Sequence, residues 1–173
     1  MRSFPILLPA LLGLLLALPV TAQEQNEAAV KAAFIYNFTK FVEWPADGGP
    51  LQLCLLGETD PLLAALTNLE GKQSQGRSIR VRSVGRNADD LEGCSVVILG
   101  ASETARVAVI LSNAQKHPAL TVSEIEHFAD AGGMIGLVVN DSRVQFEINV
   151  RAAQRANLKL SAQLLKLSQR VKR

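Results

Sequence analysis

The sequence is poor in the residues that metal sites and redox centres need. Its 173 residues include only two histidines, two cysteines, one tryptophan and one tyrosine. His117 and His127 stand apart from any acidic or sulfur ligand pattern, so a surface or helix-end position is expected for each. The sequence therefore predicts neither a metal site nor a cofactor.

The motifs of common catalytic and nucleotide-binding sites are also missing. Gly71-Lys72 lacks the earlier glycine and the following serine or threonine of a phosphate-binding loop. Gly57 and Gly100 follow apolar runs but form no dinucleotide fingerprint, and Ser102 has no glycine-flanked elbow around it. We therefore expect a protein that is not an enzyme.

No charge excess points to nucleic acid. Lysine and arginine total 18 against 16 aspartate and glutamate residues, which gives a net charge of +2. Nucleic-acid-binding proteins usually carry a concentrated basic face, whereas the basic groups here are small and scattered. Nucleic acid is not expected as a partner.

Long apolar runs are confined to the start of the chain. Met1-Arg2 is a short basic opening, Ile6 to Leu18 is mostly apolar, and Pro19 to Ala22 ends in small residues. This order is typical of a secretory signal peptide, with cleavage after Ala22. We expect residues 1–22 to be a signal peptide and residues 23–173 to form one exported domain.

The segment Val30 to Pro45 is where the aromatic residues gather. It holds three of the six phenylalanines, the only tyrosine and the only tryptophan. Val30, Phe34, Phe38 and Phe41 recur at helical spacing, and Pro45 should end the helix at Glu43 or Trp44. This face is either the main contribution to the core, or it leaves Tyr36 or Trp44 exposed for a partner.

Strands and helices alternate through the middle of the chain. The expected strands are 51–56, 79–84, 95–99 and 119–122, and the expected helices are 60–69, 102–113 and 123–130. A β-hairpin, 134–139 with 143–150, and a final helix over 152–171 follow. The expected fold is α/β: an open, mostly parallel sheet with helices on both faces and a C-terminal β-hairpin and helix.

Polar residues follow two of the expected strands. Ligands gather beyond the carboxyl ends of parallel strands where the winding reverses, so Gly57, Glu58, Gly100 and Ser102 are candidates for a ligand crevice. Ordinary helix capping explains the same residues.

Cys54 and Cys94 allow one intramolecular pairing. Export makes a disulfide possible, and closing a loop of about 40 residues is worth roughly 4 kcal/mol in the chain-entropy model. Sequence spacing alone does not bring the two Cα atoms within reach of each other.

Two segments together resemble one family. VKAAFIYNFTKFVEWP near the mature N-terminus and GGMIGLVVNDSRVQFEINVRAAQRANLKLSAQLLKL near the end resemble the YfiR family (DUF4154) of bacterial exported proteins. The resemblance covers the mature chain and implies a disulfide between Cys54 and Cys94. A second cysteine pair known in the family has no counterpart, because residues 130–139 contain no cysteine.

The resemblance implies a function and partners. The family implies a periplasmic protein that binds the sensor domain of an inner-membrane diguanylate cyclase and represses it, which lowers cyclic di-GMP and biofilm formation. It also implies an OmpA-like outer-membrane lipoprotein as a second partner, and dimerisation. We expect the partner surface at the polar face of the hairpin, Arg143, Glu147 and Asn149, together with Arg151; each also fits a solvated strand face. The alternative is a periplasmic small-ligand binding protein that uses the strand-end crevice.

Overall fold

The computed structural model describes residues 20–45, 49–57, 60–85, 91–141 and 143–173. Most of the expected signal peptide and Glu58 lie outside these ranges. The expected cleavage position, after Ala22, lies in the first turn of helix α1 (Val20–Phe41). Cleavage at this position stays a prediction.

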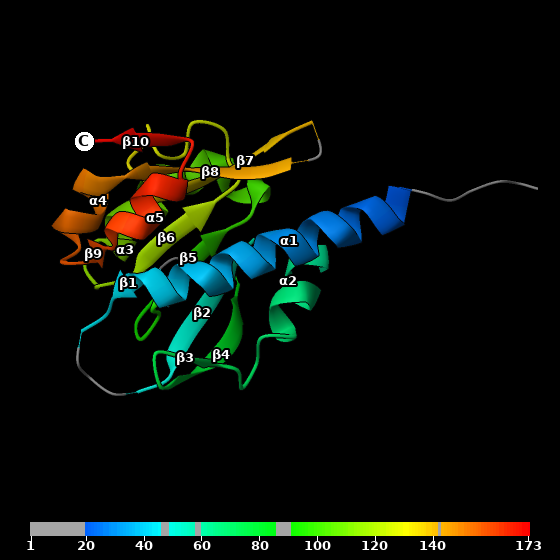
Figure 1. Cartoon of the computed structure of the whole chain (residues 1–173), viewed down its shortest axis with the longest axis horizontal. Helices are drawn as coiled ribbons and strands as arrows, with labels where there is room; N and C mark the ends of the chain where they lie inside the picture. The colour runs from blue at the N-terminus through cyan, green and yellow to red at the C-terminus, as the bar shows by residue number, and fades with distance from the viewer. Residues whose placement is uncertain (1–19, 46–48, 58–59, 86–90, 142) are drawn as a thin grey trace, which may run out of the picture.

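One eight-stranded sheet organises the chain, in the order β10-β8-β7-β6-β5-β2-β4-β3 (Figure 1). Its centre is parallel and apolar, because each central strand is covered on both faces. β8 returns antiparallel to β7, and the C-terminal strand β10 pairs parallel with β8 at the edge. The strands are β2 (Leu51–Leu56), β3 (Gln73–Ser74), β4 (Arg77–Val84), β5 (Val96–Leu99), β6 (Leu120–Ser123), β7 (Ile135–Asn140), β8 (Arg143–Asn149) and β10 (Arg170–Lys172).

Helices cover both faces of this sheet, as the sequence predicted. Helix α1 packs on one face with α2 (Asp60–Thr67), α4 (Val150–Arg155) and α5 (Ala162–Leu167). The other face is covered by the 3₁₀ helix η1 (Ala101–Arg106) and helix α3 (Val107–Ala114). The predicted α/β class is confirmed.

The aromatic helix contributes to the core, but its buried stripe differs from the predicted one. Phe38 is buried, and its ring lies 5.0 Å from that of Phe146 on β8, edge to face. Phe34 is only half-buried, and Val30 is 37% exposed. The fully buried stripe runs through Ala28, Ala32, Ile35 and Phe38, because α2 packs beside α1 and shifts the buried face toward the small residues.

The predicted end of one helix and the predicted extent of another are wrong. Helix α1 stops at Phe41 because β1 (Val42–Glu43) pairs with β9 (Lys159–Leu160). The predicted final helix, 152–171, is broken into α4, β9, α5 and β10. Asn149 and Ser161 each accept a hydrogen bond from a backbone N–H in the first turn of a short helix, which fixes two separate helix starts.

The predicted helix over 123–130 is absent. Ser123 is the last residue of β6, and its hydroxyl donates to the Leu99 carbonyl while accepting from the Ile125 amide. Residues 126–132 form turns, with His127 at a φ of 58°. Phe128 is buried in these turns, which we call the 124–133 loop.

Candidate functional site: the carboxyl ends of the parallel strands

The disulfide expected from the family resemblance is present. Cys54 on β2 is bonded to Cys94, with the Cα atoms 5.8 Å apart. The Arg82 guanidinium donates toward both sulfur atoms, at 3.3 Å from Cys94 Sγ and 3.6 Å from Cys54 Sγ. The bridge therefore ties the central strand β2 to the segment that enters β5.

Of the residues expected to line a crevice, Gly57, Gly100 and Ser102 are described, and they lie together. The chain winds from β2 to β4 on one side and continues through β5 on the other, so the sheet has its switch point between β2 and β5. Gly57 follows β2, and Gly100 follows β5, donating its N–H to the Leu56 carbonyl at 2.9 Å.

Close packing fills the space between them. Gly57 has a φ of 91°, and a Cβ there would lie 2.5 Å from Ser102 Oγ and 2.9 Å from Glu103 Cγ. Only glycine fits this conformation and this approach. Glu103 is itself buried and paired with Arg106 at 2.9 Å, so these residues pack the strand ends against each other.

An ion cluster lies beside the crevice. Lys31 on α1 is only 7% exposed; its ammonium lies 2.5 Å from the Glu27 carboxylate and also pairs with Glu124 of the 124–133 loop. Burial alone would lower the pKa of Lys31, but hydrogen bonds to Glu124 and Glu27 outweigh it and raise the pKa above 10.5. The charged cluster ties α1 to the sheet ends, and the hollow beside it measures about 200 Å³.

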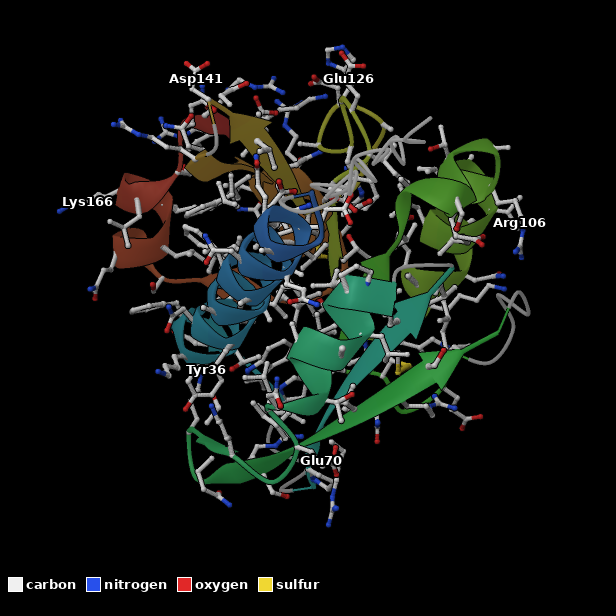
Figure 2. The ribbon with its side chains drawn as sticks, turned by 90° about the vertical axis from the view of Figure 1, so that its right-hand side faces the viewer. Tyr36, Glu70, Arg106, Glu126, Asp141 and Lys166 are labelled. Carbon is white, nitrogen blue, oxygen red and sulfur yellow. A yellow bond between two sulfur atoms is a disulfide. The ribbon has the colours of Figure 1, made fainter. Side chains whose placement is uncertain are left out.

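A larger cleft opens next to this cluster, where β7 continues beyond the end of β6. It measures about 620 Å³ and is bounded by Glu27 of α1, by residues 124–128, by residues 136–140 of β7 and by Glu147. Its volume lies within the range of about 300 to 1,000 Å³ typical of ligand sites. Figure 2 shows Glu126, in the 124–133 loop, and Asp141, at the hairpin turn, at the same end of the molecule.

The residues expected to bind a partner have different environments. Arg143 and Arg151 are exposed. Asn149 is only 4% exposed; its side chain donates to the Ala129 carbonyl at 2.8 Å and accepts from the Ala152 amide at 3.1 Å. The expectation of a surface role for Asn149 is therefore corrected: it is a helix cap, because the alternation of β8 ends where α4 begins.

Glu147 belongs to a charged network at the sheet edge. Arg170 of β10 lies 2.5 Å from Glu147 and 2.8 Å from Asp130, and Lys172 lies 3.2 Å from Asp130. Hydrogen bonds from Arg170 and Lys172 lower the pKa of Asp130 to about 2. These pairs hold the last strand and the 124–133 loop against β8.

Tyr36 and Trp44, the aromatic residues left open by the sequence, are each half-buried. The Tyr36 hydroxyl donates to the Gln73 carbonyl at 2.9 Å, and Lys40 lies 4.0 Å from its ring centre. Trp44 Nε1 donates to the Thr39 carbonyl at 3.0 Å. Both polar groups are used within the chain, so their positions are explained without a partner.

The residues that shape the large cleft were not predicted from the sequence. The spacing of Glu27 and Lys31, four residues apart, is a signal for a helix ion pair. Nothing in the sequence points to Glu124, which is 93 residues from Lys31. Among the residues that the structure describes, no group of three or more metal-ligating side chains comes together, and no helix is long and apolar enough to cross a membrane.

The arrangement is a packed α/β domain whose open features are a cleft and a strand edge. The chain belongs to the YfiR/HmsC-like family (DUF4154), whose model matches residues 28–169. Membership supports a role in the regulation of cyclic di-GMP signalling, in a family of regulators rather than enzymes.

Solved structures with a similar fold have very different sequences. A conserved domain protein from Vibrio cholerae O1 biovar El Tor matches with a TM-score of 0.59 at 8% identity. An ABC domain in complex with L-Trp from Streptococcus pneumoniae matches with a TM-score of 0.57 at 10% identity. Each match covers 84% of this chain and 60% of the other chain, so this chain spans about three fifths of their length. At such identities the likeness shows the fold alone.

Proposed function

We propose that this chain is a periplasmic regulator that binds the sensor domain of an inner-membrane diguanylate cyclase and represses it, which lowers cyclic di-GMP and biofilm formation. The observation that carries the proposal is membership of the YfiR/HmsC-like family over residues 28–169. The features of a signal peptide in residues 1–22 and the Cys54–Cys94 bridge agree with an oxidising, exported location.

The proposed contact surface is the outer part of the β7–β8 hairpin. Arg143 is exposed there, and Arg151 is exposed at the start of α4. Glu147 is only partly accessible because Arg170 pairs with it, and Asn149 is left out because it is buried. An OmpA-like outer-membrane lipoprotein, which would sequester the regulator, and a second copy of the chain are further proposed partners.

Deleting the gene and measuring intracellular cyclic di-GMP by mass spectrometry tests the proposal. Loss of a repressor should raise the intracellular concentration of cyclic di-GMP. A plasmid copy of the chain should return that concentration to the wild-type level. The strain must retain the cyclase, so a strain lacking both genes is the control and should show no rise. An unchanged cyclic di-GMP level in the single deletion would contradict the proposal.

A small-ligand binding role is the second candidate, and the cleft of about 620 Å³ favours it. The Streptococcus pneumoniae domain with a similar fold was solved with L-Trp, a small amphipathic ligand of the size that such a cleft holds. The crevice expected at Gly57 and Gly100 is a poorer site, because Ser102 and Glu103 pack closely against Gly57. A thermal-shift screen of periplasmic metabolites tests this candidate, and a flat screen would count against it.

A further inference from the structure

The hairpin leaves part of strand β7 without a neighbour on one side. The pairing of β6 with β7 ends at Ser123 and Gly136, whereas β7 continues to Asn140. Figure 1 shows the hairpin of β7 and β8 projecting beyond the other strands, on the side of the N-terminal part of α1. Within the described part of the chain, no strand pairs with the far side of residues 137–140.

The register shows which backbone groups face this open side. Asn149 donates its N–H to the Met134 carbonyl, so the even-numbered residues of β7 bond to β8. In an antiparallel pair the residues between them point their N–H and C=O groups the other way. The Val139 N–H and C=O and the Leu137 C=O therefore point away from β8, along the edge that β6 no longer covers.

This edge lacks the usual protection. Exposed edge strands are commonly blunted by lysine, proline or a bulge, because unpaired backbone groups recruit other strands. Strand β7 has the sequence IGLVVN, contains neither lysine nor proline, and pairs in unbroken register with β8. Val139 is 38% exposed. The unpaired backbone groups of this edge can therefore hydrogen-bond to an added strand.

The cleft beside the edge is negatively charged. Its lining includes Glu27, Glu124, Glu126 and Glu147, and none of the described residues that line it is a lysine or arginine. Lys31 pairs with Glu27 and Glu124, and Arg170 pairs with Glu147. The four carboxylates of the lining still outnumber these two cations. An added strand with basic side chains would match this charge, whereas the edge of a second copy would bring like charges together.

We propose that the open edge of β7 binds an extended, positively charged peptide segment of a partner protein, which joins the sheet as a strand along Leu137–Asn140. Main-chain hydrogen bonds to Val139 and Leu137 supply affinity, and the surrounding carboxylates select basic side chains. Side chains of the added strand alternate between the α1 side, with Glu27, and the side of Glu126 and Glu147. The inference deepens the proposed regulatory function by naming the contact, and it rests on that function only for the identity of the partner.

A matched pair of proline variants tests the strand edge. Val139→Pro removes the outward N–H of β7 without breaking a bond to β8, because that N–H faces the open side. Val144, opposite Val139, points its N–H to the other edge of the hairpin, before the part of β8 that β10 covers. Val144→Pro is therefore the control, with the same chemical change on the opposite edge.

The probe is a fluorescein-labelled peptide of alternating lysine and valine, titrated into the purified oxidised protein and followed by fluorescence anisotropy. We expect Val139→Pro to weaken binding about tenfold and Val144→Pro to leave it within about twofold. A peptide of alternating glutamate and valine should not bind. Amide exchange of Val139 should slow when the lysine peptide is present. Equal affinity of the two proline variants, or exchange protection away from β7, would overturn the proposal.

A surface substitution tests peptide binding without a change to the buried parts of the fold. Glu126 is an exposed side chain of the cleft, and Glu92 is an exposed glutamate outside its lining. Glu126→Lys should weaken the lysine peptide about threefold, and Glu92→Lys should not. Dimerisation that Val139→Pro abolishes would contradict the proposal, since the occupant would then be a second copy of the chain.

The proposed regulatory function and the proposed peptide site at β7 can be tested separately. If the wild-type plasmid lowers cyclic di-GMP in the deletion strain and Val139→Pro lowers it equally, the strand edge is not the contact and this inference is wrong. If the wild-type plasmid has no effect while the lysine peptide still binds at β7, the regulatory function fails and the peptide site stands.

Discussion

Reducing the Cys54–Cys94 bridge should remove a large part of the stability of the protein. The bridge joins residues 40 positions apart, and both cysteines are buried in the core on the α3 side of the sheet. Closing a loop of about this length restricts the unfolded chain and stabilises the fold by roughly 4 kcal/mol in the chain-entropy model. Total stabilities of single domains are about 5 to 15 kcal/mol, so the bridge is a major contribution.

Urea unfolding of the oxidised and reduced protein measures this contribution. With an m value of about 2 kcal/mol/M, the loss corresponds to a midpoint lower by about 2 M in the reduced protein. Far-UV circular dichroism follows the transition in both states. A double variant, Cys54→Ala with Cys94→Ala, is the control, and its midpoint should not respond to the reductant.

A small effect of reduction on the urea midpoint would contradict this contribution of the bridge. If reduction lowered the midpoint by less than about 0.5 M, the bridge would contribute at most about 1 kcal/mol. The adjacent pairing of β2 with β5 would then hold the same segments together without it. Precipitation of the reduced protein is avoided by starting from the urea-unfolded protein and refolding it by dilution. Agreement between the unfolding and refolding midpoints shows that the transition is reversible.

Three further predictions concern the sheet ends and the hairpin. Gly57→Ala should destabilise the fold by about 1 to 3 kcal/mol, because a Cβ would lie 2.5 Å from Ser102 Oγ at a φ of 91°; a smaller urea midpoint shift than about 0.3 M would contradict this. Asn149→Ala should cost about 1 to 2 kcal/mol through loss of the α4 cap, and Asn149→Asp, which keeps the accepting oxygen, should recover part of it in thermal unfolding. The folded pKa of Asp130 is about 2, below its ordinary 3.8, because Arg170 donates to it. Its stabilising contribution is therefore present above about pH 4 and is lost as the pH falls toward 2; the Asp130→Asn variant should show a shallower stability loss over that window, and an identical profile would contradict the assignment.

The middle of the fold follows from local chemistry. Leu51–Leu56 is an apolar run ended by Gly57, and Asp60-Pro61 is a strong helix start, so β2 and α2 are predictable from these residues. The clean alternation of residues 143–149 likewise predicts β8, with Phe146 and Ile148 buried. These elements depend on nearest-neighbour preferences that agree with the tertiary fold.

The rest depends on contacts between distant segments. Ser123 and Glu126 have the spacing of a capping box, but Ser123 bonds to Leu99 on the neighbouring strand instead. The last residues contain enough leucine for a helix, yet Lys159 and Leu160 pair with strand β1 and Arg170 pairs with Asp130. The large cleft exists because β7 is longer than β6, a difference that no local pattern encodes.

Export-dependent complementation tests whether the protein represses the cyclase from the periplasm. A strain lacking the gene would receive either the full chain or residues 23–173 preceded only by a start methionine, and cyclic di-GMP would be measured in both. We expect that the full chain lowers cyclic di-GMP and that the form without residues 1–22 does not, because the proposed repression takes place at the periplasmic sensor domain. Equal lowering by both forms, or no lowering by the full chain, would contradict it.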